Sequence, residues 1–119
     1  MTDLDMSDDA EVEAAPDWHN LIYEVFNPDY SVGVGCDRAG MIVGLYLGDE
    51  VLEHADDGWL AAEVLRLARL AHMKSRVGRR AELLYHGALP HLADSLELPT
   101  EAAYNLMEKT EFARDSDYA

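Results

Sequence analysis

The first half of the chain alternates large apolar residues with small or polar ones, which is the period of a β-strand. This alternation occurs in three runs, Leu21–Asn27, Tyr30–Asp37 and Met41–Gly48. Turn signals separate the runs: a Pro-Asp dipeptide follows the first, and Gly40, which is free to adopt a positive φ, precedes the third. The pattern predicts an antiparallel meander of three strands.

Beyond residue 57 the apolar residues recur at intervals of three and four, which is the spacing of an amphipathic helix. This spacing extends from Trp59 to about Arg80. Asp56 or Asp57 can cap its start by accepting hydrogen bonds from the free N–H groups of the first turn. Gly78 is predicted to weaken the helix or to end it, and residues 80–85 are expected to be helical again after it. We therefore expect one long helix after the sheet.

Shorter segments complete the predicted fold. Gly48–Ala55 is expected to connect the sheet to the helix, and Gly87–Pro99 is expected to form a short helix and a loop. Thr100 is the expected cap of a terminal helix that ends near Arg114. The predicted fold class is α+β: a three-stranded antiparallel sheet packed against one long helix, followed by short C-terminal helices.

The 119 residues are enough for one domain. Residues 1–17 carry seven acidic side chains, no basic side chain and few large apolar groups, so we expect them to form a disordered acidic arm. Residues 18–115 are then a single α+β domain, and residues 116–119 are a frayed C-terminus.

Net charge and cysteine usage narrow the class of protein. A net charge of −15 and a pI near 4.4 describe a surface that repels nucleic-acid phosphates and anionic lipid headgroups. The single cysteine, Cys36, excludes an intramolecular disulfide and fits a reducing compartment. The chain shows no signal peptide, and no apolar stretch approaches the roughly 20 residues of a membrane span. We therefore expect a cytoplasmic protein that does not insert into membranes.

Reactive side chains are few and scattered. The five histidines are His19, His54, His72, His86 and His91. They form neither an HExxH motif nor a helical i, i+4 pair, so no metal site is predicted. Cys36 lies on the apolar side of a predicted strand, where a thiol usually behaves as a small hydrophobe. The sequence therefore predicts no catalytic residue, no metal and no cofactor, and a protein that is not an enzyme.

Several segments resemble one known family, the mycobacterial EspD- and EspH-like proteins. The stretch Val25–Val34, with the following Asp37–Ile42, resembles their sheet segment T-N-P…S-V-S-V…D-G-x-I. The helix Leu60–Lys74 resembles their L-A-x-E-I-x-x-I-A-x-L-A-R-x-K. The tail Leu98–Ala103, with Glu111–Arg114 after it, resembles their L-P-[ST]-x-E-A-A…V-F-A-T-R.

Members of that family accompany type VII (ESX) secretion systems. The resemblance covers roughly residues 20–115 and implies a non-enzymatic cytosolic chaperone or adaptor, which binds and stabilises a secretion substrate or a component of the system. The order of sheet and helix is also similar to the YbaB-like fold, whose members dimerise. That second resemblance implies an alternative function, a nucleoid-associated DNA-binding protein.

We expect a protein partner and a homodimer, because a three-stranded sheet has two edges and one helix leaves apolar area uncovered. The predicted partner-binding residues lie on the long helix: Trp59, Leu60, Val64, Leu67 and Leu70.

Basic residues on the same helix are candidates for electrostatic contacts. They are Arg66, Arg69, Lys74, Arg76, Arg79 and Arg80. In the DNA-binding alternative Lys74, Arg76, Arg79 and Arg80 would contact phosphates. The net charge and the lack of an aromatic stacking pattern argue against that alternative, so nucleic acid is not the expected partner.

Overall fold

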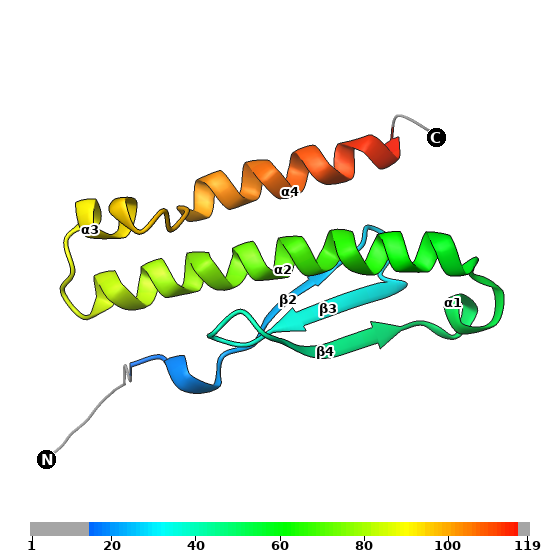
Figure 1. Ribbon diagram of the computed structural model, residues 1–119, viewed down its shortest axis with the longest axis horizontal. Coiled ribbons are helices and arrows are strands. Elements are labelled where there is room, and N and C mark those ends of the chain that lie inside the picture. Colours follow the sequence, from blue (N-terminus) through cyan, green and yellow to red (C-terminus); the bar gives the residue numbers. More distant parts are fainter. Residues whose placement is uncertain (1–14, 117–119) are drawn as a thin grey trace, which may run out of the picture.

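The computed structural model describes residues 15–116 of the chain. In this part of the chain a short helical turn and three strands come first, and four helices follow, of which the longest packs on the strands (Figure 1). Most of the predicted acidic arm, and residues 117–119 of the predicted frayed end, lie outside the described residues. In chain order the elements are η1 (Trp18–Asn20), β2 (Tyr23–Phe26), β3 (Val32–Cys36), β4 (Ile42–Leu47), α1 (Asp49–His54), α2 (Asp57–Tyr85), α3 (Pro90–Ser95) and α4 (Glu101–Ser116).

The three strands form an antiparallel sheet in the order β2-β3-β4, which confirms the predicted meander. Val32, Val34 and Cys36 project from one face of the central strand, and each is at most 2% exposed. Helix α2 packs across this face, mainly on β2 and β3. The α+β fold class, with one long helix on a small sheet and shorter helices after it, is therefore confirmed.

The opposite face of the sheet carries the glycines of β3. A Cβ atom at Gly33 would collide with the ring of Phe26, so this ring occupies the space that a side chain at position 33 would need. The Phe26 ring also lies 5.8 Å from that of Tyr46 and 5.7 Å from that of Tyr30, centroid to centroid. Aromatic residues of the neighbouring segments therefore cover part of the face that is bare along β3.

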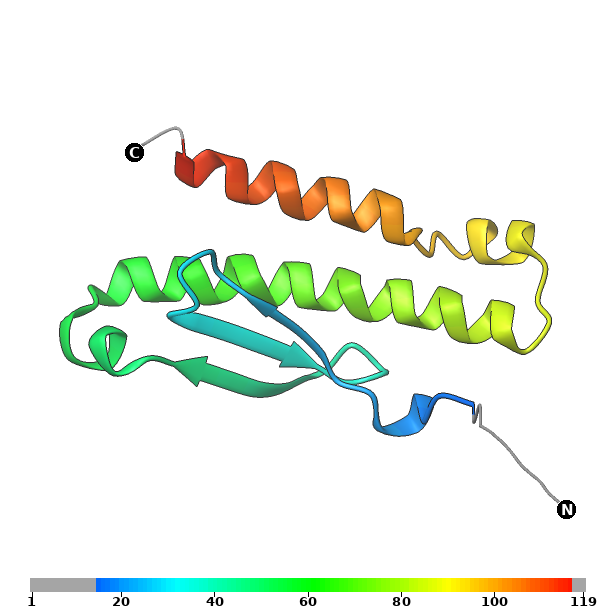
Figure 2. The same cartoon turned by 180° about the vertical axis from the view of Figure 1, so that it is seen from behind.

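Helix α2 is longer than predicted, at 29 residues or about 43 Å. Asp56 caps it, as expected, and accepts a hydrogen bond of 3.0 Å from the backbone N–H of Trp59. Residues 80–85, which were predicted to be helical again, continue the same helix, and it runs on past the sheet to Tyr85 (Figures 1 and 2).

The helix does not end at Gly78, which was one of the two predicted outcomes there, because α2 continues through it. The phenol of Tyr23 lies against this position, and a Cβ atom there would collide with its ring. Gly78 therefore allows the helix and strand β2 to approach each other closely. Within a continuous helix, its role is packing rather than termination.

The predicted connector over Gly48–Ala55 contains a short helix that the sequence pattern did not predict, α1 (Asp49–His54). Val51 is the buried residue of α1 and joins the apolar core beneath α2. The chain therefore uses α1 to reverse direction between β4 and α2 (Figure 1).

The two C-terminal helices lie along α2 on the side away from the sheet (Figures 1 and 2). The Thr100 hydroxyl accepts a hydrogen bond of 3.1 Å from the N–H of Ala103, which confirms the predicted cap of α4. Tyr104 is 4% exposed and belongs to the core, and burial raises the pKa of its phenol. Arg66 of α2 donates to Asp115 of α4 over 2.9 Å, so a charged contact holds the far end of the helix pair.

Candidate functional site

The face of α2 predicted to bind a partner is largely covered by the protein's own sheet. Leu67 and Leu70 are 0% and 4% exposed and lie in the core. Leu60 and Val64 are half-buried against the same core. Trp59, at 44% exposed, is the member of the set that solvent reaches most. We therefore correct the predicted set: a partner cannot contact Leu67 or Leu70 while the domain stays folded.

Strand β4 instead presents the apolar surface that lacks a cover. We define the β4 edge by four of its residues that are 52–58% exposed: Ile42, Val43, Leu45 and Tyr46. Leu45 lies opposite the buried Val34 and therefore on the helix side of the sheet. It stays exposed because α2 crosses β2 and β3 rather than β4.

The backbone of β4 is also available along its outer side. β4 is the last strand of the sheet, so its outward N–H and C=O groups have no neighbouring strand among the described residues. The pairing with β3 is irregular at one point, where Ile42 lies opposite Cys36 and Gly44 opposite Gly35. Val43 is the extra residue between them, which makes a β-bulge. The strand is regular from Gly44 to Leu47.

A groove of about 530 Å³ begins at the β4 edge and follows α2 towards α4. Its apolar lining includes Ile42 of β4, Leu65 and Met73 of α2, and Met107 of α4. Cys36 lies at its base, and burial raises the pKa of this thiol, which favours the uncharged form. Ile42 belongs to both the β4 edge and the groove, which therefore adjoin on the helix side of the sheet. Charged residues also line the groove: Arg66, Arg69 and Glu111.

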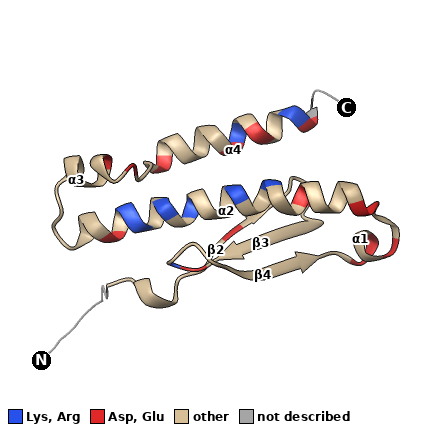
Figure 3. Cartoon of the chain, in the orientation of Figure 1, with Lys and Arg blue, Asp and Glu red and all other residues tan. Residues whose placement is uncertain are grey.

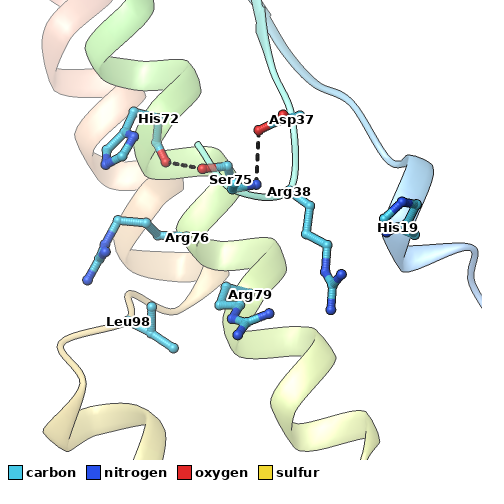
Figure 4. A pocket seen from close by; sticks show the side chains of 9 residues that line it. His19, Asp37, Arg38, His72, Ser75, Arg76, Arg79 and Leu98 are labelled. Carbon is cyan, nitrogen blue, oxygen red and sulfur yellow. Dashed lines mark hydrogen bonds between the residues drawn. The ribbon is translucent and has the colours of Figure 1, made fainter. Parts of the chain in front are cut away.

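A second hollow, of about 600 Å³, has the opposite chemistry (Figure 4). We define the basic pocket by five of its lining residues: His19, Arg38, His72, Arg76 and Arg79. They come from three elements, because His19 belongs to η1, Arg38 to the loop between β3 and β4, and the others to α2. The part of α2 that extends past the sheet brings them together.

Arg38 is held by Glu82 of α2. Its Nε donates to Glu82 Oε1 over 2.9 Å and its Nη2 donates to Oε2. The hydrogen bonds from Arg38 hold the pKa of Glu82 below its ordinary value. The same contact raises the pKa of Arg38. The paired charges fix the hairpin loop against α2 and so set one wall of the basic pocket.

The remaining predicted electrostatic residues are mostly engaged within the protein. Arg66 pairs with Glu63 and Asp115, and Arg80 pairs with Asp94 over 2.8 Å. Lys74 donates to the backbone carbonyl of Glu24. Arg69 is exposed on α2. Figure 3 shows acidic residues on α2 before and after its run of basic residues, and on the neighbouring α4.

The histidines form no metal-binding group over the described residues, although His19 and His72 both line the basic pocket. Among residues 15–116, no group of three His, Cys, Asp or Glu side chains is placed to hold a metal ion. His72 Nδ1 lies 3.3 Å from the carbonyl oxygen of Gly40, which fixes this ring in the wall of the basic pocket.

Two features of the β4 edge could have been predicted from the sequence. Both alternating faces of β4 are apolar, which is unusual for a strand with only one covered face. The last strand of a meander is also an edge by topology. The basic pocket had no signal of this kind, because Arg38 and His19 are distant in sequence from Arg76 and Arg79.

Comparisons with protein-family models, curated proteins and solved structures give no significant match to this chain. Over the described residues, no helix combines the length and apolar character needed to cross a bilayer.

Proposed function

We propose that this chain is a non-enzymatic chaperone or adaptor, which binds a substrate or component of a type VII (ESX) secretion system in the cytoplasm. The observation that carries the proposal is the β4 edge: four large apolar side chains are more than half exposed on a strand whose outer side has no neighbouring strand among the described residues. The type of system comes from the resemblance of residues 20–115 to EspD- and EspH-like proteins.

Binding at this edge follows from backbone chemistry. An extended segment of the partner can pair with β4 and add a strand to the sheet. Its side chains on the helix side then enter the groove and cover Ile42 and Leu45. Covering an apolar side chain fully stabilises a complex by about 1.5–3 kcal/mol, and these two are already nearly half covered. Partner contacts over Leu65 and Met107 add to this.

We also propose that the free protein is a homodimer in which the β4 edges of two copies cover each other. Two identical antiparallel strands can pair about a two-fold axis, so the same surface serves both copies. A client segment would then replace the second copy at the same edge. This explains how a protein with so exposed a strand stays soluble before it meets its partner.

The nucleic-acid alternative has less support. Its phosphate contacts were expected from Lys74, Arg76, Arg79 and Arg80. Of these, Arg80 is paired with a carboxylate, and Lys74 and Arg76 donate to backbone carbonyls. The net charge of −15 adds repulsion.

Affinity purification of tagged protein from cells that carry such a secretion system tests the proposal. Leu45→Lys places a charge at the centre of the β4 edge, at a residue that is already 56% exposed, so we expect the fold to survive. Leu89→Lys is the matched control, because Leu89 is 61% exposed in the loop before α3, away from the sheet.

We expect the wild type and Leu89→Lys to recover the same secretion substrate or machinery component, and Leu45→Lys to lose it. Recovery of that component by all three proteins would show that the β4 edge is not the binding site. Recovery of no secretion component by the wild type would contradict the proposed system.

A further inference from the structure

The basic pocket is an isolated positive region on a strongly acidic protein. Arg38, Arg76 and Arg79 line it, together with His19 and His72. The guanidinium group of Arg76 lies on the other side of α2 from those of Arg38 and Arg79 (Figure 4). The side chains of Arg38 and Arg79 are 37% and 47% exposed, so solvent reaches both. Figure 4 shows the guanidinium groups of Arg38 and Arg79 on the same side of α2.

The carboxylates near the pocket leave this charge only partly balanced. Glu82 is shared, because it bonds to Arg38 and lies 3.6 Å from Arg79. Asp37 lines the pocket, but its carboxylate accepts hydrogen bonds of 2.9 Å from the N–H groups of Ala39 and Met41. The hollow is thus able to accept more negative charge.

Arg76 adds to this surplus. Its Nη2 donates to the backbone carbonyls of Leu96 and Glu97, each over 3.2 Å. Within residues 15–116 no carboxylate forms an ion pair with it. Neutral carbonyls orient its guanidinium without cancelling its charge.

The part of the chain next to the pocket supplies charge of the opposite sign. Residues 1–14 contain six acidic side chains and no lysine or arginine: Asp3, Asp5, Asp8, Asp9, Glu11 and Glu13. The described chain begins at Ala15, and His19, only four residues later, is itself part of the pocket lining. An extended chain covers about 3.3–3.6 Å per residue, so every one of these acids is within reach of the pocket.

We propose that the basic pocket binds the acidic segment 1–14 of the same chain. Carboxylates of this segment accept hydrogen bonds from Arg79, Arg76 and the free N–H groups of Arg38. The occupant must be a run of carboxylates, because the pocket offers arginine donors along α2 rather than one enclosed anion site. An acidic segment of another protein can occupy the pocket only by displacing this one.

Attachment within one chain makes even weak contacts effective. A short tether holds a ligand at a local concentration of roughly 1 mM. If the free segment binds with a dissociation constant of about 100 μM, the attached segment weakens an external competitor about ten-fold. This competition is measurable with the full-length protein.

The probe is a fluorescein-labelled peptide with the sequence of residues 1–14, whose binding is followed by fluorescence anisotropy at low salt. A variant with Asp8→Asn, Asp9→Asn, Glu11→Gln and Glu13→Gln keeps the length of the segment and removes four of its charges. We expect the peptide to bind this variant about ten-fold more tightly than the wild type, because the pocket is then free. We also expect salt to weaken the binding.

Pocket variants made in this four-fold variant identify the site. Arg79→Gln removes an exposed guanidinium and should weaken peptide binding at least three-fold. Arg69→Gln is the matched control, because Arg69 lies on the same helix outside the basic pocket and should change nothing. Circular dichroism checks that both variants are folded.

Three results would overturn the proposal. If the wild type binds the peptide as tightly as the four-fold variant, the segment does not occupy the pocket, and an acidic partner in trans is the better occupant. If Arg79→Gln and Arg69→Gln have equal effects, the basic pocket is not the site. If the four-fold variant does not bind the peptide, the basic pocket is likewise not the site. None of these results bears on the β4 edge, so this proposal and the proposed function fail separately.

Discussion

Two glycines in this protein make room for aromatic rings. At Gly33 the ring of Phe26 takes the place of a side chain, and at Gly78 the phenol of Tyr23 does so. Both rings belong to β2, one on each face of the sheet, since Phe26 covers the outer face and Tyr23 contacts α2. Strand β2 therefore owes its position to the absence of two Cβ atoms on its neighbours.

Gly78→Ala tests this at the helix contact. Alanine normally stabilises a helix by about 1 kcal/mol relative to glycine. Here we expect the reverse, a loss of roughly 1–3 kcal/mol in the free energy of unfolding, because the new methyl group overlaps the ring of Tyr23. Urea denaturation measures it.

The exposed Ala62 of α2 supplies the comparison. Ala62→Gly should cost about 1 kcal/mol by helix propensity alone. A Gly78→Ala protein that is as stable as the wild type, or more so, would show that Tyr23 moves aside without cost.

The bond from Arg38 to Glu82 gives stability a defined pH dependence. The pKa of the Glu82 carboxyl is lowered in the folded protein, chiefly by hydrogen bonds from Arg38. A lowered folded pKa means that this stabilisation is fully present above the unfolded pKa, near 4.5, and is lost as the pH falls through the folded value.

We therefore expect Glu82→Gln to be less stable than the wild type at pH 7, and the difference to shrink as the pH falls below about 4.5. Chemical denaturation at several pH values between 3 and 7 measures both proteins. A difference that stays constant over this range would mean that the charge of Glu82 does not contribute.

At the scale of elements, α2 has two tasks. Its first half covers the sheet with Leu67, Leu70 and Ala71. Its second half contacts β2 through Lys74 and Gly78, lines the basic pocket, and ends beyond the sheet beside α3. Leu67 was predicted to meet a partner, yet it is fully buried. Its substitution should therefore act on folding.

Leu67→Ala should lower the free energy of unfolding by about 2–5 kcal/mol, since it leaves a cavity in the core. Leu65→Ala, on the same helix at a residue that is 58% exposed, should change it by less than about 0.5 kcal/mol. Thermal denaturation distinguishes the two. Equal effects would contradict the packing of α2 described here.

The pattern of the sequence predicted the elements well, because each was marked locally. Alternation defined the strands, and capping residues such as Asp56 and Thr100 defined the helix starts. The pattern was least informative at Gly78 and at α1, where the outcome depends on a ring from β2 and on a buried Val51. Contacts of that kind are tertiary, and a local pattern does not contain them.

The candidate site was harder to predict for the same reason. Periodicity identified the apolar stripe of α2, but a stripe does not tell whether its own sheet or a partner covers it. The choice of Leu67 and Leu70 depended on that missing information. The exposure of Leu45 depends on how far α2 reaches across the sheet, which only the assembled fold determines.

At the scale of the whole molecule, net charge and exposed apolar surface have opposite effects on the association of two copies. The net charge of −15 keeps copies apart, whereas the β4 edge draws them together at short range. We expect attraction at the edge to prevail at moderate salt, where repulsion is screened.

Light scattering after size exclusion should then give a mass of about 27 kDa at micromolar concentration, twice the 13.3 kDa of the chain. Leu45→Lys should give the mass of one chain, and Leu89→Lys the dimer mass. A monomeric wild type under these conditions would contradict self-association.

The bulge at Val43 limits the length of the partner strand that we propose to pair with β4. Regular pairing is available only from Gly44 to Leu47, a stretch that accommodates about four residues of an incoming strand. We therefore expect the partner segment to be a short linear motif with two bulky apolar residues at positions i and i+2. The partner chain beyond this motif need not stay extended. The bulge also interrupts any longer run of backbone hydrogen bonds to an added strand. It therefore opposes the stacking of many copies through β4 into a cross-β aggregate.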